Sequence, residues 1–383
     1  MQLHVRFKMS SKTAYIISLK YAPGLKKEFM VLGENIRAKG FNVKYLLSRK
    51  YSEIEGNCPG AEYISTSDHT KSIILDTIRL RMNPHIVSGL FAKDNPFFVC
   101  FYNPHPYNQT MAHLLKKEFP KVINSLYLHD PYKPDKTHYG LAKAAYISLV
   151  ELIQKKTLHY MDYVISPSEY SSQILKDHYP EFKGKNYIAP LLVPDQDKDL
   201  PVERMYFSIV GGVHQATGHD TFIELVNYVA EKAIDFKFGL ISSSDISGQI
   251  NHLTNKGRGI LNMLNKKVIK DSEINELLKN SHAVFRLDKE VTQSGVVPVC
   301  YMNSTPVIAR DIPGLRQHVR HKWNGYIVPF DCTPDDLVKA MDFVKNNFSE
   351  LSKNARQSYD ETWAESNWDR CYGWLIELLK AVD

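Results

Sequence analysis

The chain has 383 residues, of which 43% are hydrophobic and 23% are charged, with 19 glycines and 19 prolines. These values are ordinary for a soluble globular protein; they exclude collagen, coiled-coil and disordered chains, and the length predicts two domains. The five cysteines are scattered, odd in number and form no CxxC pair, so we expect a reducing compartment without a disulfide framework.

No segment reaches the ~18 uninterrupted apolar residues that a membrane-spanning helix needs. The nearest one, Leu141–Leu152, is too short and carries charge. The basic start of the chain is followed by no apolar segment, so we expect no secretory signal. These features predict a cytoplasmic protein.

Charge is unevenly distributed along the chain. Residues 1–190 contain 26 Lys and Arg against 16 Asp and Glu, a balance of +10, so the remainder has a balance of −4. A basic half indicates an anionic partner such as a phosphate, a nucleic acid or a membrane surface, and solvated basic helices are the alternative. Because the basic residues lack interleaved aromatics, we expect no nucleic acid partner.

The first half of the chain begins with a strand, a glycine-containing turn, a helix and a second strand. This order is a βαβ unit and implies a parallel sheet. Ser168 is the expected N-cap of a later helix that runs through Leu175. The strands are predicted over Thr13–Leu19, Asn42–Leu47, Pro96–Tyr102, Val122–Leu128 and Tyr163–Ser166, and the first helix over Lys26–Lys39.

The polar, proline-flanked segment Leu191–Pro201 is the expected linker, and an α/β pattern restarts after it. Two successive α/β sets predict two Rossmann-like domains that face each other across a cleft. Strands are predicted over Met205–Val210, Phe236–Ile241, Ala283–Leu287 and Thr305–Ala309, and helices over Asp220–Lys232, Asp271–Asn280, Val296–Met302 and Trp368–Val382.

Two loops in the first half are candidate ligand sites, because ligands bind beyond the carboxyl ends of strands in such folds. Gly24 lies at a helix N-terminus beside two lysines, which suits an anionic group, and a plain βα turn is the equal alternative. His129 follows a predicted strand and is placed to contact a sugar hydroxyl or developing charge. The alternative is a structural histidine that bonds to Asp130.

A third candidate loop lies in the second half. Thr292–Gly295 combines hydroxyls, a glycine and free amides at a helix start, which suits a phosphate, while a simple N-cap by Ser294 is the alternative. Asp195, Asp197 and Asp199 form a DxD-like run. Because they lie in the linker with no strand before them, we expect no metal site there.

Several segments together form a recognisable family pattern: Ser208–Ile223, Gln293–Leu315, Trp323–Pro329, Asp335–Ala340, Asp162–Tyr170 and the single residue His129. They resemble retaining GT-B glycosyltransferases of family four, and Gln293–Leu315 resembles the branch with a Gln-Ser-Gly donor loop. The resemblance covers nearly the whole chain and is weakest over residues 50–120. It implies a GT-B fold with an acceptor domain over residues 1–193, a nucleotide-sugar donor domain over 202–362, and a C-terminal helix over 363–383 that packs back on the first domain.

The resemblance also implies a reaction and its substrates. A sugar would move with retention from a UDP- or GDP-linked donor to a glycan or lipid-linked acceptor in cell-surface polysaccharide biosynthesis, without a metal or cofactor. The basic runs Lys116–Lys117 and Lys155–Lys156 would hold the enzyme on an anionic inner leaflet. The implied site comprises Gly24 near the phosphates or acceptor, His129 at the transferred sugar, Gly211 and Gly212 in the donor loop, and Gln293, Ser294 and Gly295 at the sugar and diphosphate.

The sequence departs from the family at three donor-site positions. Gly212 replaces an arginine, Thr217 a lysine, and Val299 a glutamate. Charge-assisted hydrogen bonds contribute ~1.5–3 kcal/mol each, so the loss matters. Two hypotheses follow: Arg286, Lys289 or His214 substitutes for the missing cations, or the protein is a catalytically degenerate carbohydrate-binding or scaffolding partner. For Arg286, a surface pairing with Asp288 is the alternative to a role in the site.

Overall fold

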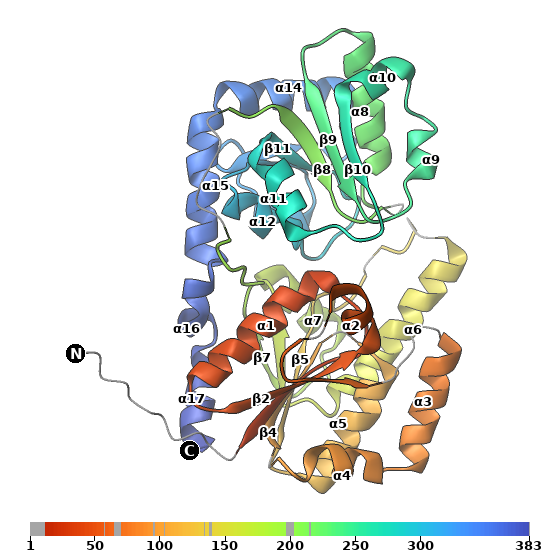
Figure 1. Cartoon of the computed structure of the whole chain (residues 1–383), viewed down its shortest axis with the longest axis vertical. Coiled ribbons are helices and arrows are strands. Elements are labelled where there is room, and N and C mark those ends of the chain that lie inside the picture. Colours follow the sequence, from red (N-terminus) through yellow and green to blue (C-terminus); the bar gives the residue numbers. More distant parts are fainter. Residues whose placement is uncertain are drawn as a thin grey trace, which may run out of the picture. The chain divides into compact units, whose positions relative to one another are not determined.

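A computed structural model describes residues 12–56, 58–64, 70–94, 96–102, 104–133, 135–137, 140–196, 203–213 and 216–382. The chain divides into two compact units. Unit 1 comprises Met1–Lys133, Leu141–Leu192 and Ser366–Asp383, and unit 2 comprises Pro134–Gly140 and Val193–Glu365. The elements of both units are labelled in Figure 1.

Unit 1 is built on a seven-stranded parallel sheet with the order β3-β2-β1-β4-β5-β6-β7. Alternate side chains point to opposite faces: Ala14 and Ile16 enter one hydrophobic cluster, and Tyr15 and Ile17 the other. Both faces are covered, which explains why the strands are apolar throughout. The strands are β1 (Thr13–Ser18), β2 (Asn42–Ser48), β3 (Ala61–Ile64), β4 (Pro96–Tyr102), β5 (Ile123–Tyr127), β6 (Tyr163–Ser166) and β7 (Lys185–Ile188).

Helices cover both faces of this sheet. The first face packs against α1 (Pro23–Ala38), α2 (Arg49–Glu55), α16 (Trp368–Cys371) and α17 (Gly373–Val382). As the sequence predicted, Ser168 caps the helix over Glu169–His178, because its side chain accepts a hydrogen bond from the Ser171 amide at 3.1 Å. The second face packs against α3 (Thr70–Met82), α4 (His85–Phe91), α5 (Pro106–Glu118), α6 (Leu141–Leu158) and α7 (Glu169–His178).

The last helical segment differs from the prediction of one helix over Trp368–Val382. It is divided at Tyr372 into α16 and α17, and Tyr372 has φ −111° and ψ 23°, outside ideal helical values. Tyr372 is fully buried, and its ring stacks on Trp368 with centroids 5.3 Å apart. The break lets Tyr372 enter the core of unit 1 while Leu375 and Leu379 face the same cluster.

Unit 2 is built on a six-stranded parallel sheet with the order β10-β9-β8-β11-β12-β13. The helices α8 and α14 pack on one face, and α11, α12 and α15 on the other. The strands are β8 (Tyr206–Val210), β9 (Lys237–Ser242), β10 (Leu261–Asn265), β11 (Ser281–Arg286), β12 (Val307–Arg310) and β13 (Gly325–Val328). The helices are α8 (His219–Glu231), α9 (Ser247–Ile250), α10 (Asn255–Ile260), α11 (Asp271–Lys279), α12 (Val296–Met302), α13 (Pro313–Arg316), α14 (Pro334–Asn346) and α15 (Phe348–Thr362).

The predicted α/β class with two Rossmann-like parallel sheets is confirmed. After its first passage through unit 2 at Pro134–Gly140, the chain leaves unit 1 again after Leu192, and residues 197–201 of the expected linker lie outside the described residues. Within the described ranges, no helix combines the length and the apolar character that crossing a bilayer requires.

Candidate functional site

Each sheet has one point where its strand order reverses. In unit 1 this point lies between β1 and β4, and in unit 2 between β8 and β11. Ligands of open α/β sheets bind outside the carboxyl ends of the strands at such a switch point. The loops after β8 and β11 therefore define the candidate site of unit 2.

The loop after β8 begins with Gly211 and Gly212. Gly211 has φ +129°, a backbone conformation that side chains rarely adopt, and its amide donates to the Ile241 carbonyl at 3.1 Å. A Cβ on Gly212 would lie 3.4 Å from the Ser244 hydroxyl, and that hydroxyl accepts from the Val213 amide at 3.0 Å. The backbone thus turns sharply and presents no side chain at these two positions.

Arg286 ends β11 and lies beside this turn. Its Nη1 is 3.5 Å from the Val210 carbonyl oxygen and 3.8 Å from the position that a Cβ on Gly211 would occupy. Its Nη2 forms an ion pair with Asp288 Oδ1 at 3.0 Å, and both side chains are largely buried. The pairing with Asp288, given above as the alternative, is therefore present, but it is buried and not on the surface, and the guanidinium also lies at the switch point. Its Nε makes no hydrogen bond within the described part of the chain.

Contacts join the loop after β8 to the carboxyl end of β11 and the residues that follow it. The Lys289 amide donates to the Ala216 carbonyl at 2.8 Å, and Gly218, at φ +70°, packs so closely on β11 that a Cβ would lie 2.2 Å from the Leu287 carbonyl oxygen. Thr217 Oγ1 lies 2.9 Å from His219 Nδ1. His214, predicted as a substitute cation, lies outside the described residues.

The loop at Thr292–Gly295 is more buried than a ligand-binding loop was expected to be. Thr292, Gln293 and Ser294 are at most 2% exposed. Ser294 Oγ accepts from the Val297 amide at 3.4 Å, which is the capping role given above as the alternative, and Gly295 is the N-cap residue of α12. These contacts fix the shape of the loop.

His318, two residues after the end of α13, holds the same loop and was missed from the sequence. Its Nε2 lies 2.7 Å from Gln293 Oε1, and burial lowers the pKa of His318 to about 4, so its imidazole is neutral at pH 7 and donates this bond. Gly314 packs against the loop so tightly that a Cβ would lie 1.8 Å from the Val291 carbonyl oxygen. No local sequence signal marks either contact.

Arg310 is another buried arginine of unit 2 that sequence reasoning missed. It ends β12, donates from Nη1 to the Leu287 carbonyl at 2.8 Å and stacks over the Phe330 ring. Its position at a strand end was a usable signal, equal to the one that singled out Arg286. Arg310 supports the carboxyl end of β11, where the candidate site begins.

In unit 1, His129 follows β5 by two residues. Its Nδ1 lies 3.3 Å from Asp130 Oδ2, and Lys133 lies 3.7 Å from the other oxygen of the same carboxylate. The contact with Asp130 is the structural alternative given above, and it orients the imidazole with Nε2 as its other polar atom. The side chain is 22% exposed.

Gly24 is the second residue of α1, and no heavy atom lies within 4 Å of the position that its Cβ would take. Pro23 at the first helical position suits the start of the helix, since its missing amide hydrogen would have no partner there. The structure brings Gly211, Gly212, Thr217, Arg286 and Lys289 together in unit 2, while Gly24 and His129 belong to unit 1.

The acidic run of the linker was weighed as a metal site. Asp195 instead forms an ion pair with Arg356 at 2.6 Å, and Asp197 and Asp199 lie outside the described residues. In the parts of the chain that the structure describes, no three His, Cys, Asp or Glu side chains are grouped to hold a metal ion.

No protein-family model matches the sequence, and no curated protein matches it. Solved structures do match. A glycosyltransferase from Rickettsia africae ESF-5 is 14% identical, with 98% of this chain and 99% of that one covered and a TM-score of 0.69. The chain has the GT-B fold.

Two other structures support the same fold. The sucrose-phosphate synthase of Thermosynechococcus elongatus is 14% identical, with 97% and 100% coverage and a TM-score of 0.70. The pneumococcal O-GlcNAc transferase GtfA, solved in complex with UDP and GlcNAc, is 9% identical, with 96% and 99% coverage and a TM-score of 0.70. At sequence identities of 9–14%, the structural similarity to these proteins establishes the fold of this GT-B chain and nothing finer.

Proposed function

We propose that the protein is a retaining glycosyltransferase of the family-four type that transfers a sugar from a UDP- or GDP-linked donor to a glycan or lipid-linked acceptor. The observation that carries the proposal is the position of Arg286 beside Gly211 at the switch point of unit 2. The GT-B fold supports it, and so does the UDP and GlcNAc complex of the structurally similar GtfA.

Loss of the nucleoside diphosphate from the sugar concentrates negative charge on the leaving phosphate. Cationic groups and oriented amides that face this charge stabilise the transition state. Arg286 supplies the cation that Gly212 and Thr217 lack: Asp288 holds its Nη2, while its Nη1 lies beside the turn. Lys289 follows the end of β11 by three residues and is the second candidate cation.

The remaining site residues have proposed supporting roles. His129 contacts the transferred sugar near the reacting carbon through Nε2, while Asp130 orients its ring. The open space around Gly24 leaves room for the donor phosphates or the acceptor. Gln293 and Ser294 have buried side chains, so we assign them to shaping the loop that carries Gly295. Transfer would need no bound metal.

A second hypothesis is a catalytically degenerate GT-B protein that binds a carbohydrate or acts as a scaffold. This hypothesis is favoured by the three departures from the family pattern, in which Gly212 and Thr217 replace an arginine and a lysine, and Val299 replaces a glutamate. The ion pair with Asp288 also neutralises part of the charge that Arg286 would offer. We give the enzyme priority because a guanidinium still lies at the switch point.

The proposal includes a location. The +10 balance of residues 1–190 favours a peripheral protein on the anionic inner face of a membrane, acting in cell-surface polysaccharide biosynthesis.

Thermal unfolding in the presence of UDP-, GDP-, dTDP- and CMP-sugars tests the proposal. A saturable rise in Tm with one nucleotide, lost in Arg286→Ala, supports the enzyme, because a ligand that binds only the folded state stabilises it. Arg316→Ala is the matched control, since Arg316 forms an exposed ion pair with Asp311. No shift with any nucleotide sugar at millimolar concentration would favour the degenerate protein.

A further inference from the structure

We infer that the outer face of α3, α5 and α6 in unit 1 is a membrane-docking surface whose groove binds the phosphate of an anionic phospholipid headgroup. The inference names the surface that would contact the membrane and the ligand that it would bind. It rests on the part of the proposed function that places the protein at a membrane. It requires neither the candidate site of unit 2 nor glycosyl transfer.

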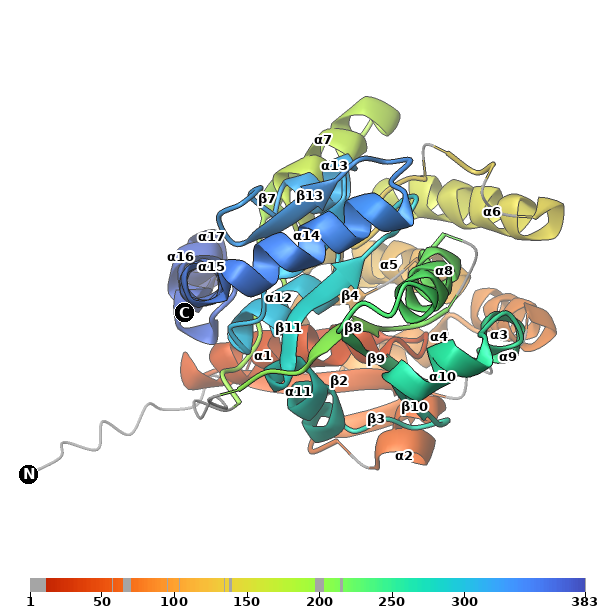
Figure 2. The same ribbon diagram turned by 90° about the horizontal axis from the view of Figure 1, so that it is seen from above.

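The three helices form a layer in which α5 is the deepest. It packs against α3 on one side and α6 on the other (Figures 1 and 2). Seven of the 13 residues of α5 are buried. By contrast, only Gln154, Thr157 and Leu158 are buried among the 18 residues of α6. The two flanking helices therefore stand further out from the sheet than α5 does.

The flanking helices expose large apolar side chains. On α6, Leu141 is 93% exposed and Leu149 and Leu152 are each 51% exposed, while on α3 Leu75 is 65% and Met82 75% exposed. A helix that is apolar on several sides is normally covered, and clustered exposed apolar groups mark protein or membrane contacts.

The exposed part of α6 is suited to lie on a membrane. The segment Leu141–Leu152 carries only two charged residues, Lys143 and Glu151. Twelve residues are too few to span a bilayer, but a helix that lies in the interface does not need to span it. Leu141–Leu152, which is too short to span a bilayer, therefore fits a helix that lies in the membrane interface.

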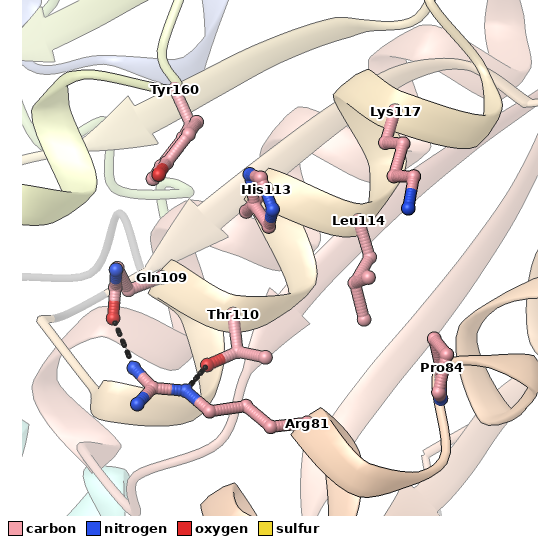
Figure 3. A pocket seen from close by; sticks show the side chains of 8 residues that line it. All are labelled: Arg81, Pro84, Gln109, Thr110, His113, Leu114, Lys117 and Tyr160. Carbon is pink, nitrogen blue, oxygen red and sulfur yellow. Dashed lines mark hydrogen bonds between the residues drawn. The ribbon is translucent and has the colours of Figure 1, made fainter.

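A groove lies along the outer side of α5, between the end of α3 and the residues after α6 (Figure 3). It has a volume of about 400 Å³ and is lined by Arg81, His113 and Lys117 among eight residues, none of them acidic. Arg81 is held in place because its guanidinium donates to Thr110 Oγ1 at 3.3 Å and to Gln109 Oε1 at 3.1 Å. Arg81, held by these bonds, and the exposed Lys117 are two cations in a groove without a lining carboxylate, which favours an anionic ligand.

Charge complementarity selects the occupant. Basic side chains border the apolar ones on both flanking helices, with Arg79 on α3 and Lys143 and Lys156 on α6. Such a mixture of apolar and basic groups matches an anionic bilayer, whose acyl region takes the apolar side chains and whose phosphates take the cations. The groove then holds one headgroup phosphate.

Co-sedimentation of the full chain with lipid vesicles tests this inference. The wild-type protein is expected to sediment with phosphatidylglycerol vesicles and not with phosphatidylcholine vesicles at low salt. Arg81→Gln/Lys117→Gln should weaken binding about 25-fold, at roughly fivefold per cation near the surface. Leu149→Gln/Leu152→Gln should weaken it about tenfold or more. Arg49→Gln/Lys50→Gln, the same charge change on exposed residues of α2, which covers the opposite face of the sheet, should leave binding unchanged.

Equal weakening by the groove and control variants, or equal binding to both vesicle types, would overturn the headgroup site. If the wild type forms an oligomer that Leu149→Gln/Leu152→Gln dissociates, and sedimentation with vesicles is unchanged, then the face binds protein instead of a membrane. Because Arg81 also bonds to α5, Lys117→Glu alone repeats the test with an exposed side chain. The nucleotide-sugar Tm shift is measured on every variant. A variant that no longer sediments but keeps the Tm shift separates membrane docking from the proposed transfer activity. If no nucleotide sugar shifts the Tm but the protein still sediments, the docking surface is supported although the proposed activity is not.

Discussion

Glu28 and Tyr372 are 344 positions apart in sequence, and the Tyr372 hydroxyl donates a hydrogen bond to the Glu28 carboxylate in the core of unit 1. The other oxygen of this carboxylate accepts from the Leu192 amide at 2.9 Å. One buried carboxyl group on α1 therefore joins the last residue of Leu141–Leu192, the second segment of unit 1, to the C-terminal helical segment of the same unit.

This group predicts a pH-dependent stability. Burial raises the pKa of Glu28 to about 7, above its ordinary value. The groups that face it are Cys100, Tyr102, Tyr127 and Tyr372. Burial raises their pKa values above their own ordinary values, so they stay neutral over the same pH range. Because the folded-state pKa is raised, the stabilising contribution is complete below the unfolded pKa and is lost as the pH rises through about 7.

We therefore expect the free energy of unfolding of the wild type to fall between pH 5 and pH 8 by up to ~3 kcal/mol more than that of Glu28→Gln. Denaturant unfolding of both proteins at the two pH values measures the difference. Parallel pH profiles for the two proteins would show that Glu28 does not titrate in this range.

Arg286→Ala should weaken binding of the cognate nucleotide sugar about 10- to 150-fold, because it removes a charge-assisted hydrogen bond worth ~1.5–3 kcal/mol. Arg286→Lys keeps the charge and should lose less. Titration calorimetry on the three proteins gives the ratios. Unchanged affinity in Arg286→Ala would remove this residue from the donor site.

Gly314→Ala should destabilise unit 2 by roughly 1–3 kcal/mol, because the new Cβ would meet the Val291 carbonyl oxygen, which is backbone and cannot rotate away. The loop with Gln293 and Ser294 should shift with it, and donor affinity should fall. Thermal unfolding measures the first effect. A variant as stable as the wild type would mean that the loop can move at no cost.

Gly24→Ala provides the opposite case. No heavy atom lies within 4 Å of its Cβ position, and alanine favours a helix by ~1 kcal/mol, so Tm should stay level or rise slightly. Transfer should slow all the same if phosphates or the acceptor approach this backbone closely. Full activity with unchanged Tm would place the substrates elsewhere.

His129→Ala should abolish transfer while nucleotide binding persists, because His129 belongs to unit 1 and the cations proposed to hold the diphosphate, Arg286 and Lys289, belong to unit 2. Asp130→Asn should cost less, since it only loosens the orientation of the imidazole. Comparing kcat with the nucleotide Kd for each variant separates the two effects. A loss of nucleotide binding in His129→Ala would contradict the assignment.

The sequence by itself determined the fold class and most of the sheet. Runs such as Pro96–Tyr102 are apolar throughout, which is the pattern of a strand buried on both faces, and the structure has β4 over those residues. The sequence also placed Arg286 at a strand end and Ser168 at a helix start. These features depend on neighbouring residues, so they are visible within a short window of sequence.

Tertiary structure alone decided which of these features meet. Arg286 reaches the Val210 carbonyl 76 positions away because β8 and β11 are adjacent in the sheet, and Gln293 meets His318 because α13 packs on its loop. The break at Tyr372 was equally invisible, since the predicted helix is interrupted only to bring that side chain to Glu28. Such contacts are selected by packing over long separations, where helical and strand periodicity carry no information.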